Sequence, residues 1–252
     1  MSMRIVGVIP SRWGSTRFPG KSLAMIAGRT LLDRVIERVR MAQRLDAVWV
    51  ATDDERIAMA ARSYGAEAIL TRPEHPSGTD RIAEALQGRE ADGVVNIQGD
   101  EPLLDPAMID AVAGVLADSP EWDMVTAACP ITTAEELHSP DVVKVVRAND
   151  GCALYFSRAV IPFLRGAPTG FSPVAGLHLR HIGLYGYRRA FLERLVKTPP
   201  SPLEQAEKLE QLRALQLGCR MKVLDAPASG IGVDTPADVA RVEACLRQAA
   251  EK

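Results

Sequence analysis

The first half of the chain alternates short, unbroken apolar runs with segments of helical periodicity, and this alternation constrains the fold more than any other feature. A strand covered on one face is apolar at every second position, whereas a strand buried on both faces is apolar throughout. The runs here are of the second kind and span residues 5–9, 48–51, 68–70, 94–97 and 124–128. We therefore predict an α/β fold in which helices cover both faces of parallel strands.

The clearest intervening helix is predicted to begin after Thr30. The Thr30 hydroxyl can cap the free amides of the first turn, and Asp33 would lie at the positive end of the helix dipole. An apolar stripe follows at helical spacing, formed by Leu31, Leu32, Val35, Ile36 and Val39. Two later helices have similar start signals, which are Ser201 with Glu204 in a capping box and Thr235 followed by proline.

The regular alternation ends after about Pro130. The segments VVKVVR, CALYFS and HIGLYGY have strand character in a less regular order, and a Gly/Pro-rich stretch covers residues 165–176. We predict an inserted antiparallel portion at about residues 130–190, with a flexible arm, continuous with the main fold. A chain of 252 residues with 47% hydrophobic content can bury one large core, so we expect a single domain over residues 1–252.

Composition and charge exclude several classes of protein. A formal net charge of -2, from 30 basic and 32 acidic residues, provides no overall field to attract nucleic acid or an anionic membrane. The cysteines show no C-x-x-C spacing, which argues against a zinc cage or a disulfide framework; they are Cys129, Cys152, Cys219 and Cys245. The N-terminal apolar run is too short for a signal peptide or a membrane span. We expect a cytoplasmic protein with reduced thiols.

A cationic loop directly follows the first apolar run. Residues 9–23 read IPSRWGSTRFPGKSL and carry Arg12, Arg17 and Lys21 among glycine and proline. The glycines are spaced for neither a P-loop nor a dinucleotide-binding turn. The loop is therefore either a solvated turn or a seat for a polyanion such as a nucleoside triphosphate, at the sheet edge where open α/β folds bind ligands.

This loop and seven further motifs resemble one family. The loop is similar to the pattern IPARYxSTRLPGKPL of the 3-deoxy-manno-octulosonate (Kdo) cytidylyltransferases, or CMP-Kdo synthetases. The other motifs follow in the family's order: SGTDR at 77–81, NIQGDEP at 96–102, VKVV at 143–146, ALYFSRAVIP at 153–162, LRHIGLYGYR at 179–188, PSPLEQAEKLEQLR at 200–213 and GVDTPADVARV at 232–242. The resemblance spans nearly the whole chain and implies a Rossmann-like nucleotidyltransferase with a mixed sheet, an inserted antiparallel portion and a homodimeric assembly.

Two carboxylates, Asp100 and Asp234, are candidate ligands for Mg²⁺. Asp100 follows a predicted strand and leaves the sheet at its ligand-binding edge, and Mg²⁺ is commonly held by one or two carboxylates together with phosphate oxygens. By composition alone, the two segments are an ordinary turn and an ordinary helix cap. The resemblance implies instead that both bind Mg²⁺ over the triphosphate and the attacking hydroxyl, and that Arg12 and Lys21 complete the catalytic set.

The resemblance also implies the remaining contacts with the substrates. Those to the nucleotide come from Arg12, Arg17, Lys21, Ser77, Arg81 and Gln98. Those to the sugar acid come from Gln98, Arg158, His181, Tyr185, Glu210 and Gln211.

Each of these assignments has a plainer structural alternative. Ser77 and Arg81 can be a helix cap and an exposed arginine. His181 and Tyr185, four residues apart, would share one strand face and can be a half-buried, hydrogen-bonded pair. Glu210 can belong to the solvated surface of a leucine-striped helix that begins near Ser201.

The sequence thus predicts transfer of CMP from CTP to the anomeric hydroxyl of Kdo, which gives CMP-Kdo and pyrophosphate for lipopolysaccharide synthesis. The expected partners are CTP, Kdo, Mg²⁺ and a second copy of the chain, with no nucleic acid and no membrane insertion. The alternatives are a transferase for an 8-amino Kdo analogue or a sialic acid, and a non-catalytic CTP-binding module. Departures from the family pattern leave the dimer contact and fine sugar selectivity open; they are Ser11, Trp13, Phe18, Ser22 and residues 165–177.

Overall fold

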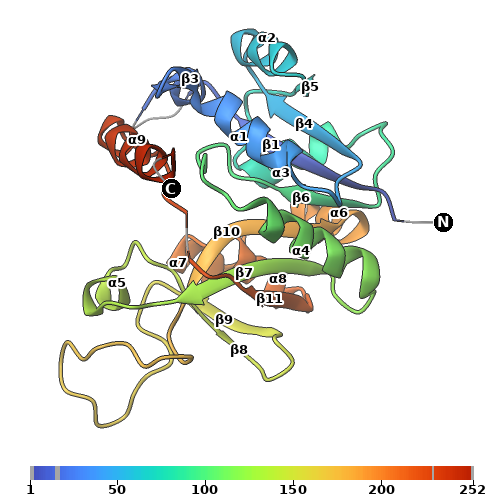
Figure 1. The fold of residues 1–252 in the computed structure, drawn as a ribbon. Helices are drawn as coiled ribbons and strands as arrows, with labels where there is room; N and C mark the ends of the chain where they lie inside the picture. The colour runs from blue at the N-terminus through green and yellow to red at the C-terminus, as the bar shows by residue number, and fades with distance from the viewer. Residues whose placement is uncertain (1–2, 15–17, 229, 251–252) are drawn as a thin grey trace.

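One mixed sheet of nine strands runs through the computed structural model, which describes residues 3–14, 18–228 and 230–250 (Figure 1). The strand order is β11-β7-β10-β6-β1-β4-β5, and β8 pairs with both β10 and β9. The strands are β1 Ile5–Ser11, β4 Ala47–Thr52, β5 Glu67–Leu70, β6 Gly93–Asn96, β7 Met124–Pro130, β8 Lys144–Arg147, β9 Ala153–Ser157, β10 Leu179–Arg188 and β11 Met221–Asp225; β2 Met25–Ile26 and β3 Arg29–Thr30 form a separate hairpin.

The sheet contains both parallel and antiparallel strand pairs, as the sequence predicted. β1 pairs in parallel with β4 and β6, and β4 pairs in parallel with β5. β10 runs antiparallel to β6, β7 and β8, whereas β7 and β11 are parallel to each other. The predicted class, an α/β fold with a mixed sheet, is confirmed. The antiparallel strands from residues 130–190 join the same sheet as the parallel ones.

Helices cover both faces of the sheet, because neighbouring residues of the buried strands point into two different cores. Ile5 and Ile9 of β1 pack into the core beneath α1, α2, α4 and α9, while Val6 and Val8 pack into the core beneath α3, α6 and α8. The helices are α1 Leu31–Arg40, α2 Glu55–Ser63, α3 Gly78–Ala85, α4 Pro106–Asp118, α5 Ala134–His138, α6 Arg189–Lys197, α7 Pro202–Glu207, α8 Gln211–Gln216 and α9 Pro236–Ala250, with a 3-10 turn η1 at Lys21–Leu23.

The helix caps follow the sequence, but one predicted helix is broken. The Thr30 hydroxyl accepts a hydrogen bond from the Asp33 amide, and Ser201 forms a capping box with Glu204, as predicted. The leucine-striped helix expected from Ser201 is instead two short helices, because Lys208 adopts a left-handed conformation with φ of 55°. The carboxylate of Glu204 then pairs with Arg213 at 3.2 Å, which ties the two helices together.

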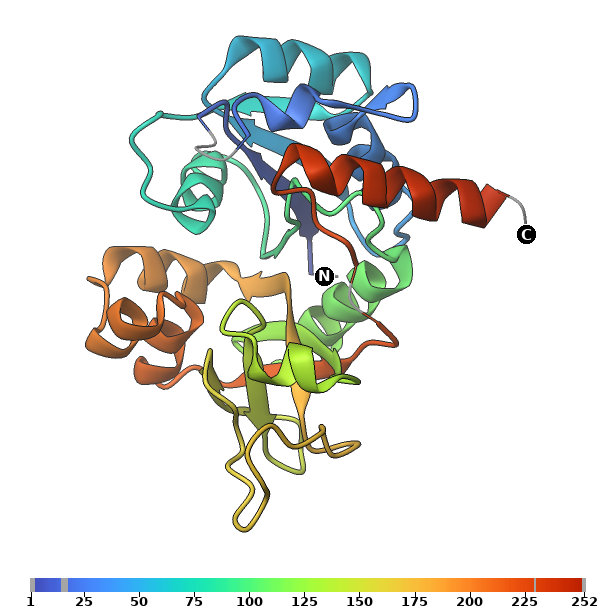
Figure 2. The same ribbon diagram turned by 90° about the vertical axis from the view of Figure 1, so that its left-hand side faces the viewer.

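Two peripheral segments border the sheet. The chain between β9 and β10 forms an arm that projects from the sheet (Figures 1 and 2). α9 lies beside the β2–β3 hairpin, where the Ala27 amide donates a hydrogen bond of 2.7 Å to Glu243. Within the described residues, no helix combines the length and apolar character required to cross a membrane.

Candidate active site

A hollow of about 380 Å³, here called the first hollow, lies at the carboxyl ends of β1 and β6. This edge is where parallel strands of open α/β sheets deliver ligand-binding side chains. The start of α3 and the segments that precede α8 and α9 complete its wall. It collects most of the residues predicted for the reaction, namely Arg12, Lys21, Ser77, Arg81, Gln98, Asp100, Glu210 and Asp234. Arg17 lies outside the described residues.

The ammonium group of Lys21 brings the two predicted metal ligands together. Its Nζ atom donates to Asp100 Oδ2 at 2.6 Å, to the Val233 carbonyl at 3.3 Å and to Asp234 Oδ1 at 3.4 Å. Gly20 adopts a left-handed conformation with φ of 68° just before η1, which aims Lys21 into the hollow. The buried hydroxyls of Ser11 and Ser22 share a hydrogen bond of 2.7 Å that holds the loop to β1.

The donor set around Lys21 fits Mg²⁺. The ammonium is a stand-in cation, and two carboxylates from distant parts of the sequence converge on it. In the described part of the chain, no cluster of three or more His, Cys, Asp or Glu side chains could hold a metal ion. Two carboxylates that leave the other positions to phosphate oxygens and water are the arrangement that Mg²⁺ prefers. Asp100 and Asp234 would hold the ion here.

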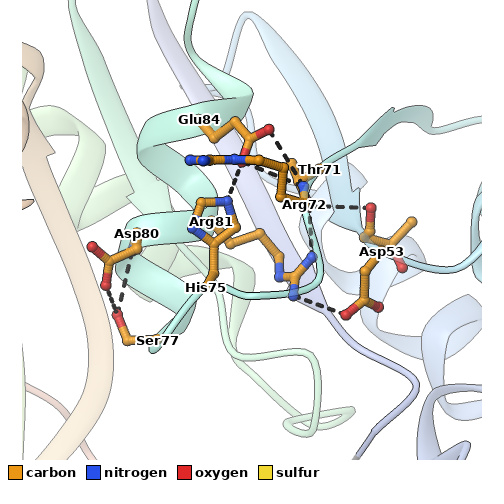
Figure 3. A network of polar contacts seen from close by, with 9 residues as sticks. Asp53, Thr71, Arg72, His75, Ser77, Asp80, Arg81 and Glu84 are labelled. Atoms are coloured by element: carbon orange, nitrogen blue, oxygen red, sulfur yellow. Dashed lines mark hydrogen bonds and ion pairs between the residues drawn. The ribbon is translucent and has the colours of Figure 1, made fainter.

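Arg81 is buried and held by a polar network, so the alternative of an exposed arginine is excluded. Its side chain is 3% exposed; Nη1 donates to the Thr71 hydroxyl at 2.6 Å and Nη2 to Asp53 Oδ2 at 3.0 Å (Figure 3). The other oxygen of Asp53 accepts the Trp13 amide at 3.3 Å. Asp53 therefore ties the cationic loop after β1 to α3, which keeps Arg81 at the wall of the first hollow.

The predicted sugar contacts on β10 share a face despite an irregularity in the strand. The register with β7 shifts between Ile182 and Tyr185, so that His181 pairs with Ala128 and Tyr185 with Thr126. Ala128 and Thr126 are alternate residues of β7 and therefore lie on the same face of the sheet. Their partners His181 and Tyr185 share that face, and the two ring centroids are 5.2 Å apart. The Thr126 hydroxyl lies 2.9 Å from the Leu184 carbonyl and 3.0 Å from His181 Nε2, which fixes the imidazole.

Burial disfavours the charged forms of these side chains. Desolvation lowers the pKa of His181 to about 3, so its imidazole is neutral in the folded protein. Desolvation likewise raises the pKa of Tyr185 well above its ordinary value. Burial also raises the pKa of Glu210, although hydrogen bonds from Thr79 and Ser77 oppose the rise.

Comparisons with known proteins connect this geometry to a family. The cytidylyltransferase family matches residues 6–222. A 3-deoxy-manno-octulosonate cytidylyltransferase of Geobacter sulfurreducens is 48% identical over 95% of this chain and 98% of its own length. One of Myxococcus xanthus is 50% identical over 98% of each chain. This chain belongs to the 3-deoxy-manno-octulosonate cytidylyltransferase family.

A solved relative of the family has the same fold. The structure of CMP:2-keto-3-deoxy-manno-octonic acid synthetase complexed with CTP matches with a TM-score of 0.91 and 41% sequence identity, over 97% of this chain and 99% of that one. The family resemblance that the sequence motifs carried is therefore confirmed.

Of the six predicted sugar contacts in this cytidylyltransferase, Gln98 and Glu210 line the first hollow and His181 lines the second. The other three, Arg158, Tyr185 and Gln211, line neither. Arg158 donates from Nε to the Glu207 carbonyl at 2.7 Å and from Nη1 to the Pro140 carbonyl at 2.9 Å, away from the residues that line the hollow. Gln211, in the first turn of α8, is 6% exposed. Their contacts with a sugar acid remain predictions.

A second hollow, of about 650 Å³, shares Asp100 and Asp234 with the first and was not predicted. Glu101, Arg180 and His181 contribute to its wall. Burial raises the pKa of Glu101 to about 7, the neighbouring charge of Asp100 adds to the rise, and Arg180 opposes it. Glu101 could have been found from the sequence, because it is adjacent to Asp100. Asp53 and Thr126 could not, because the residues that they contact are distant in sequence.

Proposed function

We propose that this chain transfers CMP from CTP to Kdo, giving CMP-Kdo and pyrophosphate. One observation supports the proposal most strongly: Lys21, Asp100 and Asp234 converge at the edge of a cationic loop, in a chain that belongs to the Kdo cytidylyltransferases over nearly its full length. The solved relative that matches most of the chain is a complex with CTP. Triphosphate binding therefore suits the first hollow.

The chemistry needs positioning and charge neutralisation more than a protein nucleophile. The anomeric hydroxyl oxygen attacks the α-phosphorus of CTP, the bond from that phosphorus to the pyrophosphate oxygen breaks, and the hydroxyl proton is released. Arg12 and Lys21 would offset the negative charge on the α-phosphate and on the departing pyrophosphate. Lys21 has a flexible stem, so its ammonium can move from the carboxylates to phosphate oxygens.

We propose that the enzyme depends on Mg²⁺, bound by Asp100 and Asp234. When bound, Mg²⁺ supplies a Lewis acid that lowers the pKa of the sugar hydroxyl and orients it. The support for this proposal is the convergence of the two carboxylates on one cation. His181, Tyr185 and Gln98 would position the sugar acid through uncharged hydrogen-bonding groups.

We also propose a cytoplasmic homodimer that uses the portion at about residues 130–190. Leu154 of β9 is 59% exposed and Phe163 of the following arm is 84% exposed. A second copy of the chain that covered both side chains would remove this apolar surface from water. None of the four cysteines forms a disulfide in the described part of the chain, which suits a reducing compartment.

Pyrophosphate release from CTP and Mg²⁺ with a panel of sugar acids tests the proposed function. The panel contains Kdo, an 8-amino Kdo analogue and a sialic acid. We expect Kdo to give the highest kcat/KM. A higher kcat/KM with another sugar acid would assign that sugar acid as the substrate in place of Kdo. Binding of CTP without turnover of any sugar acid in the panel would indicate a non-catalytic module.

A further inference from the structure

The cationic loop after β1 carries its two catalytic cations at opposite ends. Arg12 directly precedes Trp13, Lys21 directly follows Gly20, and both cations line the first hollow. Like charges repel each other, and a loop that contains glycines has many accessible conformations. Contacts that hold the two ends of the loop together are therefore needed to keep both cations at the hollow.

Trp13 joins the two ends of the loop. Its carbonyl accepts a hydrogen bond of 3.0 Å from the Gly20 amide. A Cβ atom added to Gly20 would lie 2.8 Å from one carbon atom of the Trp13 ring and 3.1 Å from two others, so the indole packs directly on this glycine. The same indole packs against the core that contains Ile9 and Ile26. Trp13 thus fixes the residue from which the Lys21 side chain is aimed.

The guanidinium of Arg56 covers the indole of Trp13. Its Cζ atom lies 3.3 Å from the ring centroid, within the range of a cation–π contact. Asp54 holds this guanidinium in place, because Arg56 Nε donates to Oδ1 at 2.9 Å and Nη2 to Oδ2 at 2.6 Å. Asp54 is also the N-cap of α2, so the start of a helix anchors the contact with the loop.

We propose that Trp13 is a positioning residue for triphosphate binding, whose indole, held by Arg56, keeps Arg12 and Lys21 together at the first hollow. The inference rests on the proposed function, because it assumes that the triphosphate of CTP lies beside these two cations. A site whose groups are already in place loses less binding free energy in ordering them. CMP lacks the pyrophosphate portion of CTP, so loss of the indole should weaken CTP binding more than CMP binding.

The test is the dissociation constant of CMP divided by that of CTP, with both measured by calorimetry in the presence of Mg²⁺ and without a sugar acid. We expect this ratio to fall about 10-fold in Trp13→Ala, which loses both the cation–π contact and the packing on Gly20. In Arg56→Gln, which loses the cation alone, it should fall about 3-fold. Trp13→Tyr retains an aromatic face and should restore most of the ratio.

Arg89→Gln is the matched control, because it breaks another arginine–tryptophan contact away from both hollows. The Arg89 guanidinium lies 5.4 Å from the ring centroid of Trp49, and neither residue lines the first or the second hollow. Its ratio should equal that of the wild type, and thermal unfolding checks the fold of each variant. The side chain of Arg56 is 58% exposed, so Arg56→Gln decides the test if Trp13→Ala does not fold.

An unchanged ratio in Trp13→Ala, or in Arg56→Gln if the former does not fold, would overturn the inference. Equal losses of CTP and CMP affinity would also overturn it, because they indicate a general disturbance of the hollow. Equal falls in Arg56→Gln and Arg89→Gln, or in Trp13→Tyr and Trp13→Ala, would do the same. If the wild type turns over no sugar acid, the proposed function fails, and the ratio measured without a sugar acid still decides the inference. A wild type that does not bind CTP would overturn both.

Discussion

The phosphate side and the sugar side of the candidate active site offer their substrates different kinds of interaction. On the phosphate side, the carboxylates of Asp100 and Asp234 each lie within 3.4 Å of the Lys21 ammonium, and all three side chains are partly exposed. On the sugar side, His181 and Tyr185 of β10 are half-buried, and His181 is neutral because desolvation lowers its pKa to about 3. Charged groups in an active site accelerate a reaction by stabilising the charge that develops in the transition state. Neutral groups held in fixed positions discriminate between substrates by their shape and hydrogen bonding. Changes on the phosphate side should therefore cost turnover, and changes on the sugar side should cost selectivity.

Asp100→Asn should have the largest effect. It removes the carboxylate that makes the shortest contact with Lys21 and a predicted ligand of Mg²⁺. We expect pyrophosphate release to fall at least ~10³-fold, since a charge that organises the transition state is lost. The melting temperature should stay close to that of wild type. Turnover near the wild-type rate would refute the metal role.

Lys21→Ala should lose at least ~10²-fold in kcat, comparable to deleting one transition-state donor. Lys197→Ala, at the end of α6 and outside the walls of both hollows, is the matched control. Full activity in Lys21→Ala would remove this ammonium from the mechanism and weaken the contrast between the two sides.

Thr126→Val tests the sugar side. The Thr126 hydroxyl bonds to the carbonyls of the β10 irregularity and orients His181, so its loss leaves buried carbonyls without a donor. We expect the free energy of unfolding to fall by about 1–3 kcal/mol. KM for the sugar acid should rise while KM for CTP stays unchanged. Thr126→Ser should restore both quantities, and a rise in both KM values would argue against a role confined to the sugar side.

The pH dependence of stability tests the neutrality of His181. Its pKa is about 3 in the folded protein against an ordinary value of 6.5, so the unfolded chain takes up a proton first as the pH falls. Stability from this group is present above pH 6.5 and is lost as the pH decreases toward 3, by about 2 kcal/mol between pH 7 and pH 5. His181→Gln should lose less stability over this interval by that amount. Identical pH profiles would show that His181 is not kept neutral by the fold.

The sequence predicted the parts of the molecule that depend on local pattern. Apolar runs located β1, β4, β6 and β7, because burial on both faces makes a strand apolar at most positions. The run at β5 was also found, although β5 is an edge strand in which only Ile69 is buried. The caps at Thr30 and Ser201 were also correct, since capping is decided within three or four residues. The loop after β1 was found because its charges and glycines are adjacent in sequence.

The parts that were missed depend on packing between distant segments. The break at Lys208 allows both Leu209 and Leu212 to be buried, a tertiary requirement that a leucine stripe does not reveal. The irregularity in β10 is held by Thr126 of another strand. Asp53 pairs with Arg81, and Glu84 contacts His75. Neither partner is adjacent in sequence, so no local motif indicated Asp53 or Glu84.

Diffraction from crystals of the protein with CTP and Mn²⁺, recorded for the anomalous signal of manganese, tests the central claim most directly. The account predicts a peak with one carboxylate oxygen of Asp100 and one of Asp234 about 2 Å from the same ion. The ammonium of Lys21 should have moved to phosphate oxygens. A peak bound by only one of the two carboxylates, or by neither, with Lys21 still between them, would contradict the account.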